Sequence, residues 1–225
     1  RDLAILKANN KKMLGVKIFD DPLKSKPYPN NTKLTKFFLT GAPHEFAGYQ
    51  KTNFYVGRYV ESFKKKLIIF DIFNFYTTTI GKDIFDIEKI NLNEISTNIK
   101  DFTNLRGIRD MKIINDKIYL FAIFEDSLNS GKYNVEILSA ELDFNKSTDS
   151  FEKFTFKSFL KFNLNSDDYV QSGGRIDEFK SNHIIVSFGD FQSQKWDGVE
   201  EDFFSDNNYF GKIISINLNT KEIDV

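Results

Sequence analysis

The chain has 225 residues, a formal net charge of −1 and no cysteine. The balance of charges gives no general attraction to nucleic acid or anionic lipid, and the lack of cysteine excludes disulfides, thiolate chemistry and cysteine-ligated metal centres. No apolar run is long enough to span a membrane. Aromatic residues make up 16% of the chain, with 25 Phe among them, which supplies ample material for a hydrophobic core.

The first 56 residues differ from the rest and are predicted to be a lead-in segment of mostly irregular structure. Residues 4–14 could form a short helix, and the proline-rich stretch 21–31 is typical of a loop or an extended crossing. Residues 33–39 have the pattern of a strand. Because the chain begins at Arg1, a signal peptide or membrane anchor upstream of it would not be visible.

Three later segments share one pattern, in which a glycine-led strand, a short polar turn and a second β-branched or aromatic strand follow one another. They are residues 57–70, 107–121 and 174–188. This pattern is typical of a β-hairpin. The anchors Leu67, Ile118 and Ile184 recur about every 50 to 65 residues, which is the length of a propeller blade with variable loops. The repeat therefore predicts the inner hairpins of three consecutive blades.

The blades are expected over residues 57–97, 105–162 and 173–225. The outer strand of the first blade is predicted near 84–92, and residues 151–162 are predicted to close the second. The expected fold class is all-β, a β-propeller of four-stranded antiparallel blades. A ring of the six-bladed type needs roughly 300 residues or more at this repeat length, so we expect the chain to cover only part of the ring.

The third blade carries a more specific pattern. In order, it reads Gly173-Gly-Arg-Ile, Ile184-Ile-Val-Ser-Phe-Gly-Asp190 and, after an acidic loop, Tyr209-Phe-Gly-Lys-Ile-Ile-Ser-Ile-Asn217. This order resembles the glucose/sorbosone dehydrogenase family of β-propellers, which includes the soluble quinoprotein sugar dehydrogenases. The resemblance is strongest over 173–217 and weaker over 105–125. The two glycines at its start are expected to allow a positive φ or a close approach of the backbone.

The resemblance implies a fold that uses pyrroloquinoline quinone (PQQ) and calcium to oxidise sugars. In the family, a histidine four residues before the arginine of the Gly-Arg-Leu turn accepts the hydroxyl proton during hydride transfer. Counted back from Arg175, that position holds Gln171, and an amide cannot accept this proton near neutral pH. The nearest histidine, His183, is expected at the far end of the hairpin. Gln171, Arg175 and Asp190 are the candidates to face a ligand channel.

Other polar residues have a structural and a functional interpretation. Arg175 either bridges neighbouring blades through backbone carbonyls, for which its forked donors are suited, or binds a ligand in the channel. Asp197, Asp202 and Asp206 could hold calcium, and a solvated acidic loop would have the same composition. His44 has no second histidine nearby, so it is not expected to bind zinc or iron.

The sequence leaves three functions open, because a fold alone does not fix function. The first is a non-catalytic binding or scaffolding propeller in the periplasm or outside the cell, without a cofactor, whose partner is another protein or a small carbohydrate-like ligand. The second is a quinone-dependent sugar or aldehyde dehydrogenase with an altered base, which would use PQQ and calcium. The third is a calcium-dependent lactonase-like hydrolase. The glutamine at the histidine position favours the first.

Overall fold

The computed structural model describes most of the chain from residue 58 onward and two short strands before it. The described residues are 15–18, 37–40, 58–71, 73–79, 92–167, 169, 172–191 and 208–225. The chain divides into two compact units, Arg1–Asn53 with Gly81–Leu92 and Phe54–Ile80 with Asn93–Val225.

In the first unit, the described strands are β1 (Gly15–Ile18) and β2 (Phe37–Thr40), which pair antiparallel. The strand predicted at 33–39 overlaps β2. The helix predicted at 4–14 lies outside the described residues. Within the described part of the chain, no helical segment has the length and apolar character needed to cross a bilayer.

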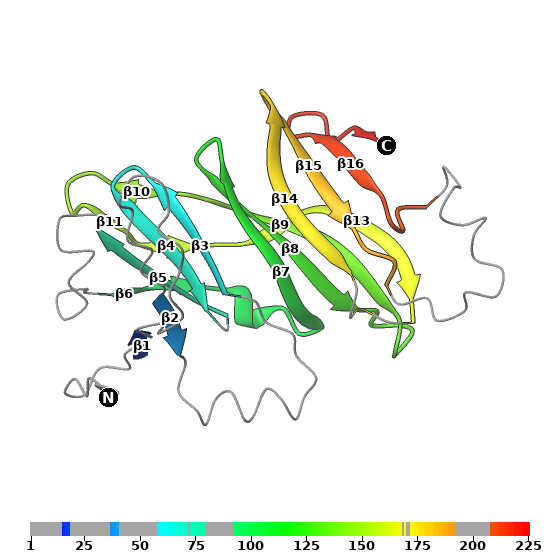
Figure 1. Ribbon diagram of the computed structural model, residues 1–225, viewed down its shortest axis with the longest axis horizontal. Coiled ribbons are helices and arrows are strands. Elements are labelled where there is room, and N and C mark those ends of the chain that lie inside the picture. The colour runs from blue at the N-terminus through cyan, green and yellow to red at the C-terminus, as the bar shows by residue number, and fades with distance from the viewer. Residues whose placement is uncertain are drawn as a thin grey trace, which may run out of the picture. The chain divides into compact units, whose positions relative to one another are not determined.

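The second unit contains three sheets of four or five strands that follow one another along the chain (Figure 1), besides a two-stranded sheet. Blade 1 consists of β3 (Arg58–Phe63), β4 (Lys66–Asp71), β5 (Asn74–Thr79) and β6 (Asn93–Thr97). Blade 2 consists of β7 (Leu105–Ile114), β8 (Lys117–Glu125), β9 (Tyr133–Glu141) and β13 (Lys157–Ser166). Blade 3 consists of β14 (Gly173–Lys180), β15 (His183–Phe188), β16 (Ile213–Asn217) and β17 (Ile223–Asp224).

Each blade is an antiparallel meander that starts with its inner strand. Strand β7 contacts both β3 and β14, and in Figure 1 these three strands lie side by side. Antiparallel four-stranded sheets with neighbouring inner strands are the architecture of a β-propeller. The protein is therefore all-β, and its ring is not closed within the described residues. The three predicted hairpins lie in three separate sheets, as the repeat predicted.

The segment between β9 and β13 departs from the prediction. Residues 151–162 do not form one outer strand, because β13 closes blade 2 and the residues before it turn toward blade 1. After the hairpin of β10 (Phe144–Asn145) and β11 (Ser150–Phe151), strand β12 (Lys153–Phe154) pairs parallel with β6.

Aromatic packing explains this detour. The ring centroid of Phe154 lies 5.2 Å from that of Phe75, and the centroid of Phe151 lies 5.9 Å from that of Phe63. Burying these rings against blade 1 stabilises this arrangement. The outer strand predicted at 84–92 lies outside the described residues, and the fourth strand of blade 1 is β6.

Burial depends on the position of each blade in the row. In β8 the residues from Ile118 to Ile123 are all buried, because blade 2 has a neighbouring blade on each face. In β15 buried and half-buried residues alternate, because blade 3 is packed on the face toward blade 2. Continuous apolar runs are typical of strands that are covered on both faces.

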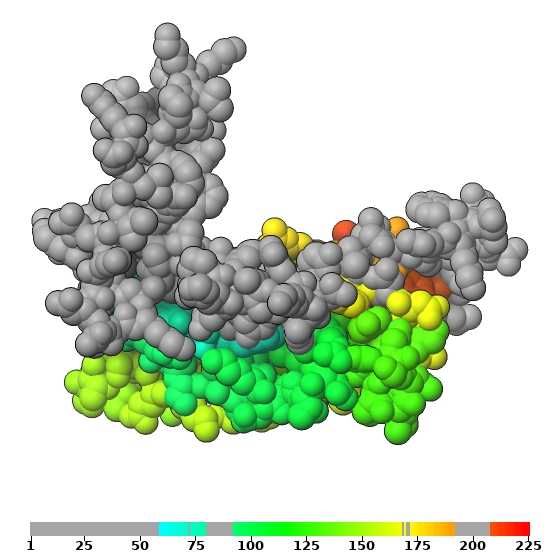
Figure 2. Space-filling view, turned by 90° about the horizontal axis from the view of Figure 1, so that it is seen from below, coloured from blue at the N-terminus to red at the C-terminus, as the bar shows by residue number. Residues whose placement is uncertain are grey.

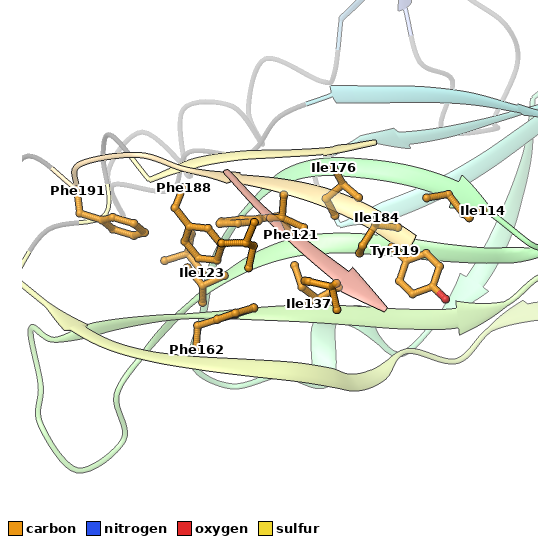
Figure 3. Packing of buried hydrophobic residues seen from close by; sticks show 14 residues of the cluster. Ile114, Tyr119, Phe121, Ile123, Ile137, Phe162, Ile176, Ile184, Phe188 and Phe191 are labelled. Atoms are coloured by element: carbon orange, nitrogen blue, oxygen red, sulfur yellow. The ribbon is translucent and has the colours of Figure 1, made fainter. Parts of the chain in front are cut away.

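A large hydrophobic cluster lies between blades 2 and 3 (Figure 3). The ring centroid of Phe188 in blade 3 lies 5.4 Å from Phe121 and 4.9 Å from Phe162 in blade 2. Figure 3 shows Ile176 and Ile184 directed into the same cluster from blade 3. Each such side chain stabilises the fold by about 1.5–3 kcal/mol when it is fully buried, so this cluster holds the two blades together.

Two glycines at the start of β14 permit this close packing. Gly173 and Gly174 have φ values of +69° and +107°. A Cβ on Gly174 would overlap that of Arg109 and lie 2.9 Å from Cδ1 of Phe121, in the neighbouring blade. The predicted positive φ and close approach are confirmed.

We expect Gly174→Ala to lower the free energy of unfolding by about 2–4 kcal/mol, because left-handed backbone strain adds to overpacking against blade 2. Gly131→Ala is the matched control, since Gly131 has a φ of +82° and no atom within 4 Å of an added Cβ. It should cost only the strain of about 1–2 kcal/mol. Urea denaturation of both variants measures the difference, and equal losses would contradict the packing role of Gly174.

Candidate functional site

The inner strands carry two rows of polar side chains that run from blade to blade. The tyrosine row consists of Tyr59, Asp110 and Arg175, and the lysine row consists of Glu61, Lys112 and Asp177. The members of the lysine row pair in register with Ile68, Tyr119 and Ile185. Each of these partners is the third residue of its strand, so the three charged residues occupy equivalent places in the three blades.

In the lysine row, one ammonium group links three blades. Nζ of Lys112 lies 3.7 Å from Oε1 of Glu61 and 3.0 Å from Oδ1 of Asp177. The hydrogen bond from Lys112 lowers the pKa of the Asp177 carboxyl. Burial raises the pKa of Glu61, although the positive charge of Lys112 acts to lower it. The row alternates acid, base and acid, and the Asp177 side chain at its end is 64% exposed.

The tyrosine row contains a buried carboxylate. Asp110 accepts the backbone N–H of Ile176 at 2.8 Å and a guanidinium N–H of Arg175 at 3.4 Å. The hydroxyl of Tyr59 donates to the carbonyl oxygen of Ile108 at 3.0 Å. Burial, reinforced by the negative charge of Asp110, raises the pKa of Tyr59 to about 12, so this hydroxyl stays protonated and remains a donor.

Arg175 therefore contacts a carboxylate of the neighbouring blade, where contacts with backbone carbonyls were predicted. Its side chain is 81% exposed. Guanidinium groups pair well with carboxylates and other planar oxyanions, so the part of Arg175 that faces solvent can still bind a polar or anionic ligand.

Asp190 lies at the same end of blade 3 as Arg175. It is the second residue after β15, and the N–H of Gly189 donates to the carbonyl of Ser172 at 2.9 Å, which joins the end of β15 to the start of β14. Other predicted site residues lie outside the described residues. They are Gln171, His44 and the acidic-loop residues Asp197, Asp202 and Asp206.

His183 lies at the opposite end of the hairpin, as predicted, because it pairs with Lys180 across the tight turn. Its Nδ1 lies 3.0 Å from the carbonyl oxygen of Ser181, and its Nε2 lies 3.3 Å from the side-chain amide of Asn217. Both ring nitrogens thus have local partners far from Arg175. Within the described ranges, no three His, Cys, Asp or Glu side chains gather as metal ligands would.

A hollow of about 500 Å³ lies on blade 2. Figure 2 shows part of the surface of this blade in green. It is lined by the end of β8, the start of β9, residues along β13 and the connection that leads into β7. Its lining residues are Asp101, Phe102, Thr103, Asn104, Phe124, Glu125, Asp126, Ser127, Asn134, Val135, Glu136, Ser158, Lys161 and Asn163.

Glu125 at this hollow is held by several donors. Its carboxylate accepts the N–H of Gly131 and the hydroxyl of Ser130, both at 2.9 Å, and it is also paired with Arg106. These contacts, the Gly131 N–H foremost, lower the pKa of Glu125 to about 2. The carboxylate fastens the loop between β8 and β9 to the base of the hollow.

The strand order and these cross-blade rows define an open β-propeller. No protein-family model and no curated protein matches the chain. Two solved structures are similar, one described as the crystal structure of glucose dehydrogenase and one as glucose dehydrogenase. They are 12% and 11% identical over 71% and 70% of this chain, with TM-scores of 0.44. The chain spans 44% and 46% of their lengths, less than half of each.

Sequence reasoning missed five of the six members of the lysine and tyrosine rows. They are Tyr59, Glu61, Asp110, Lys112 and Asp177. The lysine row could have been predicted from a charged residue near the end of each of the three inner strands. It was obscured because β14 has a register shift between Glu178 and Lys180, which displaces Asp177 by one position from Glu61 and Lys112 when residues are counted back from the turn.

We expect Asp110→Ala to destabilise the protein by about 1–3 kcal/mol, because the buried N–H of Ile176 loses its acceptor. Asp177→Ala is the control, since it removes a largely exposed carboxylate from an ion pair worth about 0–1 kcal/mol. Chemical denaturation compares the two variants. A loss for Asp110→Ala no larger than that for Asp177→Ala would show that the buried contact does not hold blades 2 and 3.

The lowered pKa of Glu125 predicts a dependence of stability on pH. Its folded pKa of about 2 lies below its ordinary value of 4.5, so its stabilising effect is complete above pH 4.5 and is lost as the pH falls toward 2. In Glu125→Gln this part of the dependence should vanish. Unfolding free energies at pH 6 and pH 3 measure it, with Glu94→Gln as the control. A wild type and Glu125→Gln that lose stability equally between these pH values would contradict the prediction.

Proposed function

We propose that this chain forms part of a β-propeller related to the sugar dehydrogenases that binds a ligand or a partner protein outside the cytoplasm and oxidises no substrate itself. The observation that carries the proposal is what the polar side chains of the inner strands bind. The polar side chains of the tyrosine and lysine rows bind side chains or backbone groups of the neighbouring blade, which is a structural use of groups that an active site would direct toward a substrate.

The position of the general base supports this proposal. Oxidation of a sugar hydroxyl needs a base within hydrogen-bond reach of that hydroxyl. By the count from Arg175 the position holds Gln171, which cannot act as that base. His183 is at the other end of the hairpin and engages Ser181 and Asn217. Arg175 remains as an exposed group that suits binding.

The relation to sugar dehydrogenases is supported by where the resembling segments lie. The Gly-Gly-Arg-Ile segment begins β14, the segment that ends in Asp190 forms β15, and the segment from Tyr209 leads into β16. These three strands are neighbours in one sheet, so the resemblance covers three of the four strands of blade 3.

The purified chain should show no measurable dye reduction with glucose or other aldoses when PQQ and calcium are added. Losing a positioned base costs about 100- to 10,000-fold in rate, and Gln171→His alone should not create activity. An active quinoprotein glucose dehydrogenase, assayed in parallel, controls for the dye and the cofactor. Robust PQQ-dependent turnover would refute the proposal and favour the dehydrogenase alternative, and calcium-dependent lactone hydrolysis would favour the hydrolase alternative.

A further inference from the structure

The hollow on blade 2 has the size of a small-molecule site. Its volume of about 500 Å³ lies within the range of about 300–1,000 Å³ that is usual for ligand pockets. It is built on strands β8, β9 and β13 and includes no member of the inner-strand rows, so what it binds is independent of the proposed function.

The hollow has more acidic than basic groups. The lining residues include the carboxylates of Asp101, Glu125, Asp126 and Glu136 and one ammonium group, that of Lys161. Since a cavity with low-dielectric walls focuses the field of its charges, this excess attracts cations and repels anions.

Two of these carboxylates keep their charge over a wide pH range. Glu125 is paired with Arg106, which offsets much of its charge. Asp126 accepts the backbone N–H groups of Leu128 at 2.8 Å and Asn129 at 3.3 Å, and these neutral donors lower its pKa without cancelling its charge. Asp126 therefore supplies a fixed negative charge to the hollow.

Glu136 shows how an amine can bind here. Its side chain is only 12% exposed, and its Oε1 lies 2.7 Å from Nζ of Lys161. Lys161 extends over the surface with 63% of its side chain exposed, so its ammonium group can withdraw into water while Glu136 stays in place. A ligand ammonium that replaces Lys161 keeps the largely buried Glu136 carboxylate paired, so the exchange leaves no uncompensated buried charge.

Two aromatic rings complete the lining. Phe102 and Phe124 meet edge to face with their centroids 5.9 Å apart, and both line the hollow. Aromatic faces attract cations and cover hydrocarbon. A neutral polyol gains less here, since Glu125 and Asp126 already accept hydrogen bonds from the protein.

We infer that the hollow on blade 2 binds a small organic cation, with its ammonium group at Glu136 in place of Lys161 and its hydrocarbon part against Phe102 and Phe124. The ligand class is a short aliphatic amine or diamine.

The test is a titration of the ¹⁵N-labelled chain with 1,5-diaminopentane, followed by NMR and calorimetry at constant ionic strength. 1,5-Pentanediol, which has the same chain and no charge, is the matched ligand control. We expect saturable shifts at the hollow with the diamine only. Lys161→Met should bind about 3- to 10-fold tighter, because Glu136 is freed, and Glu136→Gln should bind about tenfold weaker or more.

Lys157→Met is the matched protein control, because Lys157 is an exposed lysine of the same strand that does not line the hollow. It should leave the affinity unchanged. The double variant Lys161→Met with Glu136→Gln should lose the gain of the single one. The inference is overturned if the diol binds as well as the diamine, if the shifts spread over the surface without saturation, or if Lys161→Met and Lys157→Met behave alike.

Discussion

A four-stranded sheet that is apolar on both faces is stable only when a neighbouring sheet covers each face, and the rest of this structure depends on that constraint. Without cysteine, no disulfide can substitute for such packing. Blade 2 meets the constraint on both sides, which is why β8 is buried from Ile118 to Ile123. The rings of Phe121, Phe162 and Phe188 form its contact with blade 3.

The polar rows follow from the same packing. Where inner strands approach closely, as Gly174 allows, any polar group between them must find a partner or it costs stability. Asp110 meets this need for Ile176 and Arg175, and Lys112 meets it for the carboxylates on either side. These groups are thereby committed to joining the blades. The exposed Arg175 and the hollow on blade 2 are the places where we propose that ligands bind.

Local patterns predicted the hairpins because a hairpin is encoded by neighbouring residues, in two β-rich runs and a polar turn between them. The prediction for 151–162 was confirmed for 157–162, which lie in the closing strand β13, and was wrong for the residues before it, whose strand β12 pairs with blade 1. Phe151 and Phe154 pack against blade 1, and the local sequence does not indicate which sheet these residues will join. The lysine row was missed for a similar reason, since the bulge in β14 displaces Asp177 from the simple count.

The sequence by itself determined the all-β class, the three repeated hairpins and the positive φ of the paired glycines, because each of these depends on residues close together in the chain. Only the tertiary structure decided which sheet takes β12, which charges meet across the blades and where a hollow forms. These depend on contacts between residues such as Lys112 and Asp177, 65 positions apart, whose approach is set by the packing of whole sheets. A pattern along the chain carries no information on that approach until the registers of all three inner strands are known.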